Sequence, residues 1–452
     1  MIISSSPTRE PLRSGGGLKG TRVSLVDSIQ LAPGGRIAVP PTETNDRVQR
    51  LSRPDDQTDP GDGSTLRRVR GPVADELYFL CRPDRGTTDV AAQAEAVYRA
   101  MLERLASEGA SVAAVASETL FVGDNRRDLE LILDTRRRVL EEAERGPCRP
   151  VTAVIGQPPL RNGASLELSV LAVIPHHPQP QSATEVWSTP ACGCEACSRV
   201  PARLVRVGEQ THAHAGNIYG AGEDAFEQTY AMFCSGEELL REAGMSFHEV
   251  VRTWIYLRDM DRDYAEFNRA RREFFRSRGI ELMPASTAIG GEPSADAHDV
   301  SMRLYAVKSP EPLNVEVMSA PTLNEAWMYG SDFSRGLKTE DANKITLHVS
   351  GTASIDEAGR TVHVGDFAAQ AERMLVNISS LLGAHGASFQ DLVSAVAYLK
   401  NAGDAPLLRA IFHEHGFEGF PCTLVEAPIC RPELLCETEA VAVLPLPGLA
   451  RP

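Results

Sequence analysis

The sequence contains no apolar run that approaches the ~20 residues of a membrane-spanning helix. It also lacks an excess of positive charge, because 46 Lys and Arg stand against 61 Asp and Glu, for a net charge of −15. The first absence predicts that no membrane is a partner, and the second that no nucleic acid is. A small anionic substrate is compatible with this charge, because its site needs only a few local arginines.

An export signal and a regular cysteine pattern are missing as well. Residues 1–7 show no basic start followed by an apolar core, and the nine cysteines are odd in number and irregularly spaced. We therefore expect a cytoplasmic protein whose thiols are free. Its 42% hydrophobic and 24% charged residues are typical of a globular protein, and 452 residues are enough for roughly two to four domains.

Apolar residues are sparse in residues 1–70, which are rich in Gly, Pro, Ser, Asp and Arg. Such a segment cannot bury enough apolar surface to offset the entropy that is lost on ordering. The sequence predicts a flexible N-terminal segment over these residues.

From residue 71 onward, one pattern occurs three times at a spacing of about 130 residues. Each copy contains a strand, an amphipathic helix, a second strand, a second helix and a closing pair of strands. The pattern predicts an α+β chain of three tandem units, at 71–180, 205–310 and 311–450, with a cysteine-containing linker at 181–204.

A resemblance to the YjgF/Rid fold is carried by one stretch of the second unit, Val250-Val251-Arg252-Thr253-Trp254-Ile255-Tyr256-Leu257, and by Tyr264-Ala265-Glu266-Phe267-Asn268 after it. Proteins of that family are trimers with ligand clefts between subunits. The resemblance implies that the three units form a pseudo-trimer with clefts between units. It also implies that the chain is a monomer or a weak dimer.

The imine deaminases of that family need an Arg just after the proline of the closing strands, where it holds a substrate carboxylate. The matching positions in this sequence are Thr152, Ser286 and Thr423. None of them is Arg, so the resemblance does not imply imine deaminase activity.

The second and third units are also similar to chorismatases. The similarity lies in Phe333-Ser334-Arg335, Val349-Ser350-Gly351-Thr352-Ala353-Ser354-Ile355, Val364-Gly365-Asp366-Phe367-Ala368-Ala369-Gln370 and Cys430-Arg431-Pro432-Glu433-Leu434-Leu435-Cys436-Glu437. Chorismatases cleave pyruvate from chorismate, and one branch of them forms 3-hydroxybenzoate. The resemblance implies that Glu437 protonates the enolpyruvyl methylene and that Cys430 marks the hydroxybenzoate-forming branch. It implies no cofactor for this reaction.

The family's strand glutamate is matched by Glu437 and Glu167, but by Ser301 in the second unit. We expect the working cleft to use Glu437, together with arginines from the second and third units. The other two clefts are expected to lack function.

The position of Glu437 in an apolar strand supports a role as a proton donor. Protonating an enol ether carbon needs a carboxylic acid that keeps its proton near neutral pH, and an apolar strand disfavours the charged form. Glu439 lies two residues further on and points to the same face. The alternative for Glu437 is a carboxylate paired with an arginine for packing, and for Cys430 it is a small buried apolar residue.

Chorismate carries two carboxylates, so its site needs cations with fork geometry. The candidates are Arg335, Arg271 and Arg252. Arg271 lies between Arg269 and Arg272 on one predicted helix, so a solvated charged face is the alternative there.

Small residues offer further candidates for substrate binding. Gly351, Thr352 and Ala353 end a strand, where they let a ligand approach backbone donors, although tight strand packing explains them equally. Tyr219 stands between glycines and could direct its hydroxyl into a cleft, and the alternative is a simple turn.

The cluster Cys192, Cys194 and Cys197 has C-x-C-x-x-C spacing, which brings three thiols within reach of one ion. It predicts a structural zinc site or, as the alternative, a solvated loop between two units.

Two rival functions are compatible with the same residues. One is an enzyme of this fold that acts on another carboxylated intermediate of secondary metabolism, and the other is a non-catalytic protein that binds a metabolite in a cleft between units.

Overall fold

The computed structural model describes residues 66–143, 150–177, 183–187, 201–326 and 332–447. All of them belong to a single unit of the chain. The predicted flexible segment lies outside the described residues, except that its last 5 residues form strand β1 (Leu66–Arg70). The first repeated unit therefore begins before the predicted boundary at residue 71.

The described residues contain the three predicted units, and each unit has its elements in the same order. The first comprises β1, β2 (Ala74–Cys81), α2 (Val90–Ser107), β3 (Val115–Val122), α3 (Asn125–Ala143), β4 (Val151–Gly156) and β5 (Leu166–Pro175). The second comprises β6 (Ala183–Trp187), β7 (Pro201–Val207), β8 (Gln210–Ile218), α4 (Ala225–Glu242), β9 (Val250–Leu257), α5 (Met260–Arg278), β10 (Ala285–Gly290), β11 (Glu292–Pro293) and β12 (Val300–Lys308). The third comprises β13 (Asn314–Val317), β14 (Gly336–Glu340), β15 (Ile345–Ala353), α6 (Phe367–Gly383), β16 (Leu392–Leu399), α7 (Ala405–Glu414), β17 (Cys422–Glu426) and β18 (Cys436–Leu444).

The three sheets share one strand order. It is β1-β2-β5-β3-β4 in the first unit, β7-β8-β12-β9-β10 in the second and β14-β15-β18-β16-β17 in the third. In each sheet the last pair is parallel and the other pairs are antiparallel. The predicted α+β class with three tandem units is confirmed.

Extra strands extend the edges of these sheets. β6 and the first residues of β7 fall inside the predicted linker, yet they pair with each other and β7 pairs with β8. These residues therefore belong to the sheet of the second unit rather than to a linker. β11 crosses from the second unit and pairs with β4 of the first, which joins two sheets directly.

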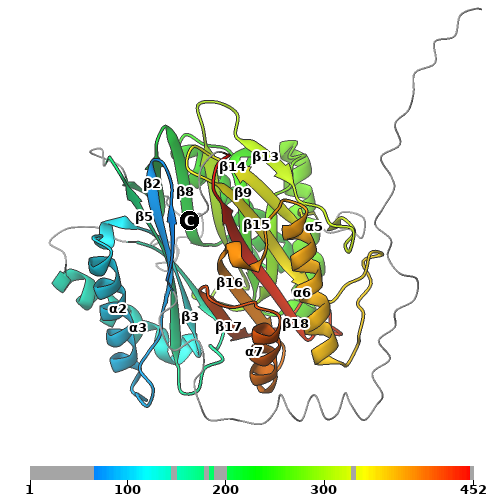
Figure 1. The fold of residues 1–452 in the computed structure, drawn as a ribbon, viewed down its shortest axis with the longest axis horizontal. Coiled ribbons are helices and arrows are strands. Elements are labelled where there is room, and N and C mark those ends of the chain that lie inside the picture. Colours follow the sequence, from blue (N-terminus) through cyan, green and yellow to red (C-terminus); the bar gives the residue numbers. More distant parts are fainter. Residues whose placement is uncertain (1–65, 144–149, 178–182, 188–200, 327–331, 448–452) are drawn as a thin grey trace, which may run out of the picture. The chain divides into compact units, whose positions relative to one another are not determined.

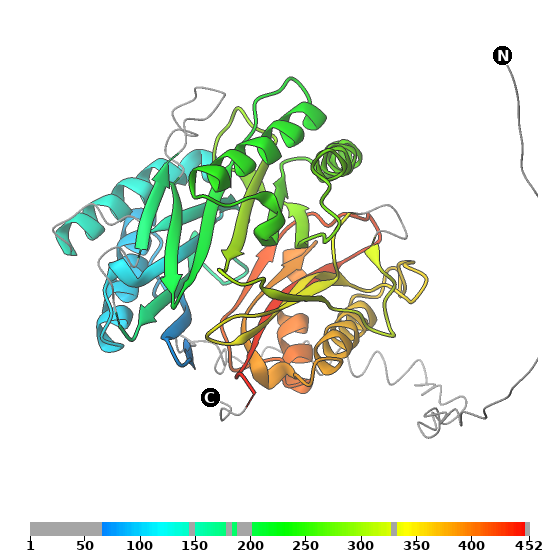
Figure 2. The same ribbon diagram turned by 90° about the horizontal axis from the view of Figure 1, so that it is seen from above.

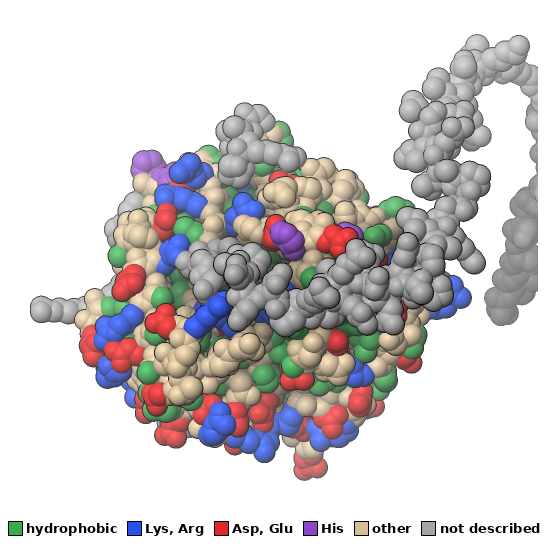
Figure 3. All heavy atoms as spheres, turned by 60° about the horizontal axis from the view of Figure 1, so that its bottom comes forward, with side chains coloured by type: hydrophobic (Ala, Val, Ile, Leu, Met, Phe, Trp, Pro, Cys, Tyr) green, Lys and Arg blue, Asp and Glu red, His purple; other side chains and the backbone are tan. Residues whose placement is uncertain are grey.

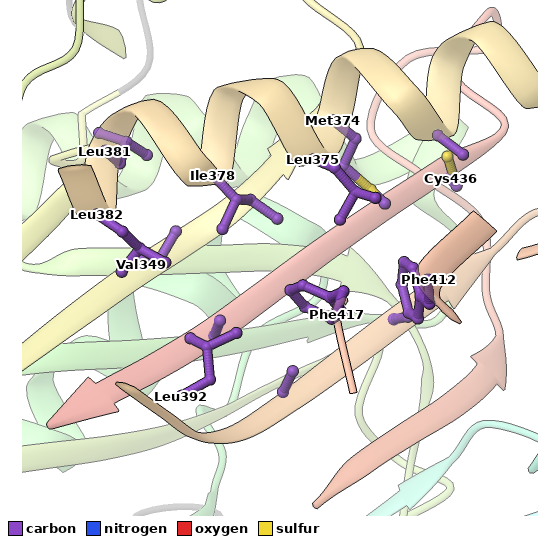
Figure 4. Close-up of a cluster of buried hydrophobic side chains, with 14 of the residues drawn as sticks. Val349, Met374, Leu375, Ile378, Leu381, Leu382, Leu392, Phe412, Phe417 and Cys436 are labelled. Atoms are coloured by element: carbon purple, nitrogen blue, oxygen red, sulfur yellow. The ribbon is translucent and has the colours of Figure 1, made fainter. Parts of the chain in front are cut away.

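The first helix of each unit begins after an aspartate. Asp89, Asp224 and Asp366 each accept a hydrogen bond from a backbone N–H in the first turn, which stabilises a helix N-terminus. Apolar residues then recur three and four positions apart along the helix, so that one face packs against the sheet. In α6, Met374, Ile378 and Leu382 lie on this face, above β15 and β18 (Figure 4).

The helices lie on the outside and the sheets face inward, as the view from above shows (Figures 1 and 2). The inner faces meet in a cluster of buried residues from all three units, which includes Phe121, Tyr256, Ile289, Tyr398 and Val425. Helices cover the outer face of each sheet, and the other two units cover its inner face. The clefts between units are therefore formed within one packed fold.

No helix among the described residues is long and apolar enough to cross a membrane. On the face drawn in Figure 3, positive and negative side chains are interspersed.

Removing a buried methyl-rich side chain from α6 should lower stability. Ile378→Ala, at a position that is 0% exposed, should reduce the free energy of unfolding by about 2–5 kcal/mol, because it leaves a cavity in the core. Val376→Ala on the same helix is the matched control, because Val376 is 48% exposed and its loss should change stability by less than about 0.5 kcal/mol. Urea denaturation measures both, and equal losses would contradict the assigned packing of α6.

Candidate active site

A cavity of about 290 Å³ lies between the second and third units. The second unit contributes residues of α5 and β10, and the third contributes residues of β15, β18 and the loop before β18. The lining residues are Tyr264, Asn268, Arg271, Ser286, Ala288, Phe333, Arg335, Gly351, Ala353, Ile355, Cys430, Arg431, Leu434 and Glu437. The cavity therefore brings together six of the predicted site residues, namely Glu437, Cys430, Arg335, Arg271, Gly351 and Ala353.

Glu437 is the acidic group of this cavity. It lies on β18 opposite Ala353 and Tyr398 and is only 5% exposed. Burial, followed by the charge of Glu439, raises the pKa of Glu437 to about 8, although Arg335, Arg252 and Arg431 act in the opposite direction. The carboxyl group therefore keeps its proton at neutral pH, as an acid catalyst requires.

Gly351 is small because the carboxyl group of Glu437 lies against it. A Cβ atom at this position would come within 2.0 Å of Glu437 Oε1 and 3.0 Å of the Thr287 methyl carbon. A hydrogen atom in place of a side chain lets the acid lie flat over the strand, and this favours the functional interpretation of Gly351 over simple strand packing.

Cys430 is half-buried beside Glu437. Burial, and secondly the charge of Glu437, raises the pKa of the Cys430 thiol to about 12. The thiol therefore stays protonated, which excludes a thiolate nucleophile at this position. Cys430 also packs against the core of the second unit and against the inner cluster, so it forms part of the cavity wall.

Arg271 and Arg335 supply the cations. Each guanidinium carbon lies 5.6 Å from the centre of the Phe333 ring, so both groups contact the same aromatic side chain. Arg335 Nε donates to the Asn324 carbonyl at 2.9 Å, and Arg271 Nη2 donates to Asn268 Oδ1 at 2.7 Å. Both side chains are almost fully buried and held in place, which suits them to bind carboxylates without a large loss of side-chain entropy.

Arg252 does not line this cavity. It lies behind the cavity wall, 1% exposed, where its Nη2 donates to Glu439 Oε2 at 2.9 Å and to Thr287 Oγ1 at 2.6 Å. Burial lowers the pKa of Arg252, and the charge of Glu439 partly offsets this. Arg252 and Glu439 face a separate cavity of about 120 Å³ among the three units, so the structure does not bring Arg252 into the cavity of Glu437.

Tyr219 and Thr352 also lie outside the cavity. The Tyr219 hydroxyl lies 2.5 Å from Ser294 Oγ, and its ring stacks on His298 at 4.8 Å between centroids. Thr352 donates to the Ser350 carbonyl at 2.8 Å. It points away because successive side chains of a strand face opposite sides, so that Gly351 and Ala353 line the cavity and Thr352 does not.

Several lining residues were not singled out as site residues from sequence. Tyr264 and Asn268 precede the predicted Arg271 by seven and three positions on α5, which places all three on one helix face. That spacing was a usable signal. Ile355 and Leu434 stand in two stretches that resemble chorismatases, but they lie in loops whose path depends on tertiary contacts, so the sequence did not show that they face the cavity.

The strand register identifies the residues at the deaminase arginine position. Thr152 lies opposite Glu118, Ser286 opposite Thr253 and Cys422 opposite Ala395, and each of these partners stands four residues before its strand ends. In the third unit the position therefore belongs to Cys422 and not to Thr423. None of the three is Arg, and Ser286 lines the cavity.

The predicted metal ligands Cys192, Cys194 and Cys197 lie outside the described residues. Within the described part of the chain, no group of three or more His, Cys, Asp or Glu side chains is arranged to hold a metal ion.

The fold consists of three repeated units, and comparisons with known proteins identify the family to which the second and third units are similar. The sequence pattern of the family described as Endoribonuclease L-PSP matches residues 203–308 and 331–444. A 3-hydroxybenzoate synthase from Streptomyces hygroscopicus is 28% identical over 318 residues, which are 64% of this chain and 89% of that protein. The 3-aminoacrylate deaminase RutC from Acinetobacter baylyi is 32% identical over 97 residues, which are 21% of this chain and 77% of that protein.

A crystal structure of a chorismatase matches the fold with a TM-score of 0.55 and 17% identity, covering 81% of this chain and 98% of that one. The chain belongs to the L-PSP or YjgF/Rid-like family, to which RutC also belongs, and it is similar to a 3-hydroxybenzoate synthase over 64% of its length.

Adding one methyl group at Gly351 should displace the acid. Gly351→Ala should lower kcat by about tenfold or more, because Glu437 cannot keep its place against the new Cβ. Gly403→Ala is the matched control, because a Cβ there meets nothing within 4 Å. Steady-state kinetics of the two variants decide the point, and an unaffected kcat in Gly351→Ala would argue against the assigned position of the carboxyl group.

Removing one partner of the buried ion pair between Arg252 and Glu439 should destabilise the junction of the second and third units. Arg252→Met should cost about 3–5 kcal/mol of unfolding free energy, because Glu439 is left buried with its charge unpaired. The double variant Arg252→Met/Glu439→Leu removes both charges and should recover most of that loss. Guanidinium denaturation measures both proteins, and additive losses in the double variant would show that the two side chains do not act as a pair.

Proposed function

We propose that this chain releases pyruvate from chorismate and forms 3-hydroxybenzoate in the cavity between the second and third units. The observation that carries the proposal is Glu437, an acid that keeps its proton at neutral pH in the same cavity as two buried guanidinium groups. The similarity to a protein named 3-hydroxybenzoate synthase supports the choice of substrate and product.

In the proposed reaction, Arg271 and Arg335 bind the carboxylates of chorismate and present the enolpyruvyl group to Glu437. Glu437 donates its proton to the methylene carbon, which gives an oxocarbenium-like state. The neighbouring ring hydroxyl oxygen attacks the ring carbon that bears the ether oxygen, so this ring C–O bond breaks and pyruvate leaves with the ether oxygen. The hydroxyl gives up its proton as the three-membered ring ether forms, and this proton balances the one that Glu437 gave. The ring ether then opens at the carbon that first carried the hydroxyl, and the transfer of one ring proton to the oxygen makes the ring aromatic, with its hydroxyl at position 3.

No cofactor enters this scheme, because chorismate contains all the atoms of pyruvate and 3-hydroxybenzoate. Cys430 keeps its proton in the free protein, so we assign it to the shape of the wall beside Glu437 and to weak hydrogen-bond donation, not to nucleophilic attack. Arg431 lines the same cavity while its Nη1 donates to the Gly359 carbonyl at 2.7 Å, which holds the loop that carries Cys430.

We further infer that one chain is sufficient for activity. Its second and third units together provide the walls of a cleft that trimeric relatives build from two subunits, which supports a monomer or weak dimer acting on a small dicarboxylate. A cytoplasmic location is part of the same proposal.

Incubation with chorismate tests the activity. Pyruvate should appear together with an aromatic product of the mass of 3-hydroxybenzoate, and Glu437→Gln should lower the rate by about 10²–10⁴-fold, because an amide cannot donate this proton. Since the acid form of Glu437 is lost as pH rises through its pKa of about 8, kcat should fall about tenfold per pH unit above that value.

Glu433→Gln provides the control, because Glu433 is an exposed carboxylate in the loop just before β18. It should leave the rate and the pH profile unchanged. A folded wild-type protein that yields no pyruvate would reject the proposal, and full activity in Glu437→Gln would reject the assignment of the acid.

A further inference from the structure

A second cavity occupies the corresponding cleft between the third and first units. It measures about 360 Å³ and is larger than the one that contains Glu437. Its walls are joined across the two units, because the Leu160 N–H donates to the Leu424 carbonyl at 2.8 Å and Pro159 forms a bridge with Val425. The threefold repeat therefore places two pockets in equivalent positions, and their side chains differ.

The difference centres on Glu167, which occupies the position of Glu437. In the third unit, Ala353 lies directly opposite Glu437 on the adjacent strand. In the first unit, the last pair of the ladder is Cys81 with Leu168, so the next residue, Arg82, comes opposite Glu167. Arg82 Nε donates to Glu167 Oε2 at 2.9 Å, and Thr423 Oγ1 donates to Glu167 Oε1 at 2.7 Å. Both carboxylate oxygens accept hydrogen bonds, so Glu167 is arranged as an ion-pair partner and not as a proton donor.

The remaining walls combine positive charge with apolar surface. Three arginines and two glutamates line the cavity, namely Arg82, Arg161, Arg409, Glu167 and Glu418, and Leu424 and the rings of Phe412 and Phe420 add apolar surface. Arg409 Nη2 donates to the Leu160 carbonyl at 2.6 Å, which fixes the direction of its guanidinium group. A carboxylate suits the guanidinium side, and a flat apolar ring suits the aromatic side.

We propose that this cleft is a binding site for a small aromatic carboxylate of the benzoate class, which it holds without chemical change. The inference does not rest on the proposed function, because it uses a different cavity and none of the residues assigned to proton transfer. It also replaces the expectation that the remaining clefts lack function: this cleft lacks an acid, yet it has the size and charge of a ligand site.

Isothermal titration calorimetry with sodium benzoate tests the proposal. The full chain with Arg335→Ala serves as the background, so that binding in the cleft of Glu437 is weakened. Benzoate should bind this protein at one site, and benzyl alcohol, which has the ring but no charge, should bind at least tenfold more weakly. Adding Arg409→Ala should weaken benzoate binding about tenfold or more, and adding Leu424→Trp should fill the cavity and abolish binding.

Arg137→Ala is the matched control, because Arg137 is an exposed arginine of α3 outside the cavity and should leave benzoate binding unchanged. Circular dichroism checks that each variant is folded. If Arg409→Ala does not fold, benzoate binding to Leu424→Trp tests the proposal. The absence of any benzoate binding in the background protein, or equal binding after Leu424→Trp, would overturn the proposal. The pyruvate assay is separate, so failure of one proposal leaves the other intact.

Discussion

The junction of the second and third units depends on one buried guanidinium group. Arg252 contacts Thr287 on β10, Ser350 on β15 and Glu439 on β18, with distances of 2.6, 3.5 and 2.9 Å. Thr287 in turn accepts a hydrogen bond from the Gly351 backbone at 3.0 Å. The strand that carries the acid and the strand that faces it are thus held by a charge outside the lining of the cavity. Burying a charge in this way is costly unless it is paired, and here the partners lie on the strands β10, β15 and β18 that also carry lining residues of the cavity.

The fold was largely predictable, whereas the site was only partly so. Three repeats of strand, helix, strand and helix predicted three α+β units, because the spacing of apolar residues in the sequence shows which segments are amphipathic helices. Glu437 and Cys430 were expected at the site because their stretch resembles that of chorismatases. The structure does not bring Arg252 and Tyr219 to the cavity, because a sequence shows a residue type but not whether another part of the fold already provides its partner. Glu439 neutralises Arg252, and Ser294 satisfies Tyr219. The role of Gly351 needed the distance to Glu437, which lies 86 residues away in the chain.

The two clefts with a strand glutamate show how one neighbouring residue changes what a carboxyl group can do. Ala353 leaves Glu437 without a cation beside it on the adjacent strand, and burial then favours the neutral acid. Arg82 provides that cation for Glu167, and the carboxylate becomes part of a salt bridge. The same side chain on the same strand is an acid in one cleft and a counter-ion in another, and the choice lies in the opposing strand.

Joining the three units in one polypeptide also fixes their local concentration. A cleft formed by separate subunits is lost when the assembly dissociates on dilution, but β10 and β15 belong to the same chain and cannot diffuse apart. Each cleft is also encoded separately, so a substitution alters one pocket while the other two keep their sequence. Covalent linkage thus makes the pocket with Glu437 independent of protein concentration and leaves the pocket with Glu167 open to change on its own.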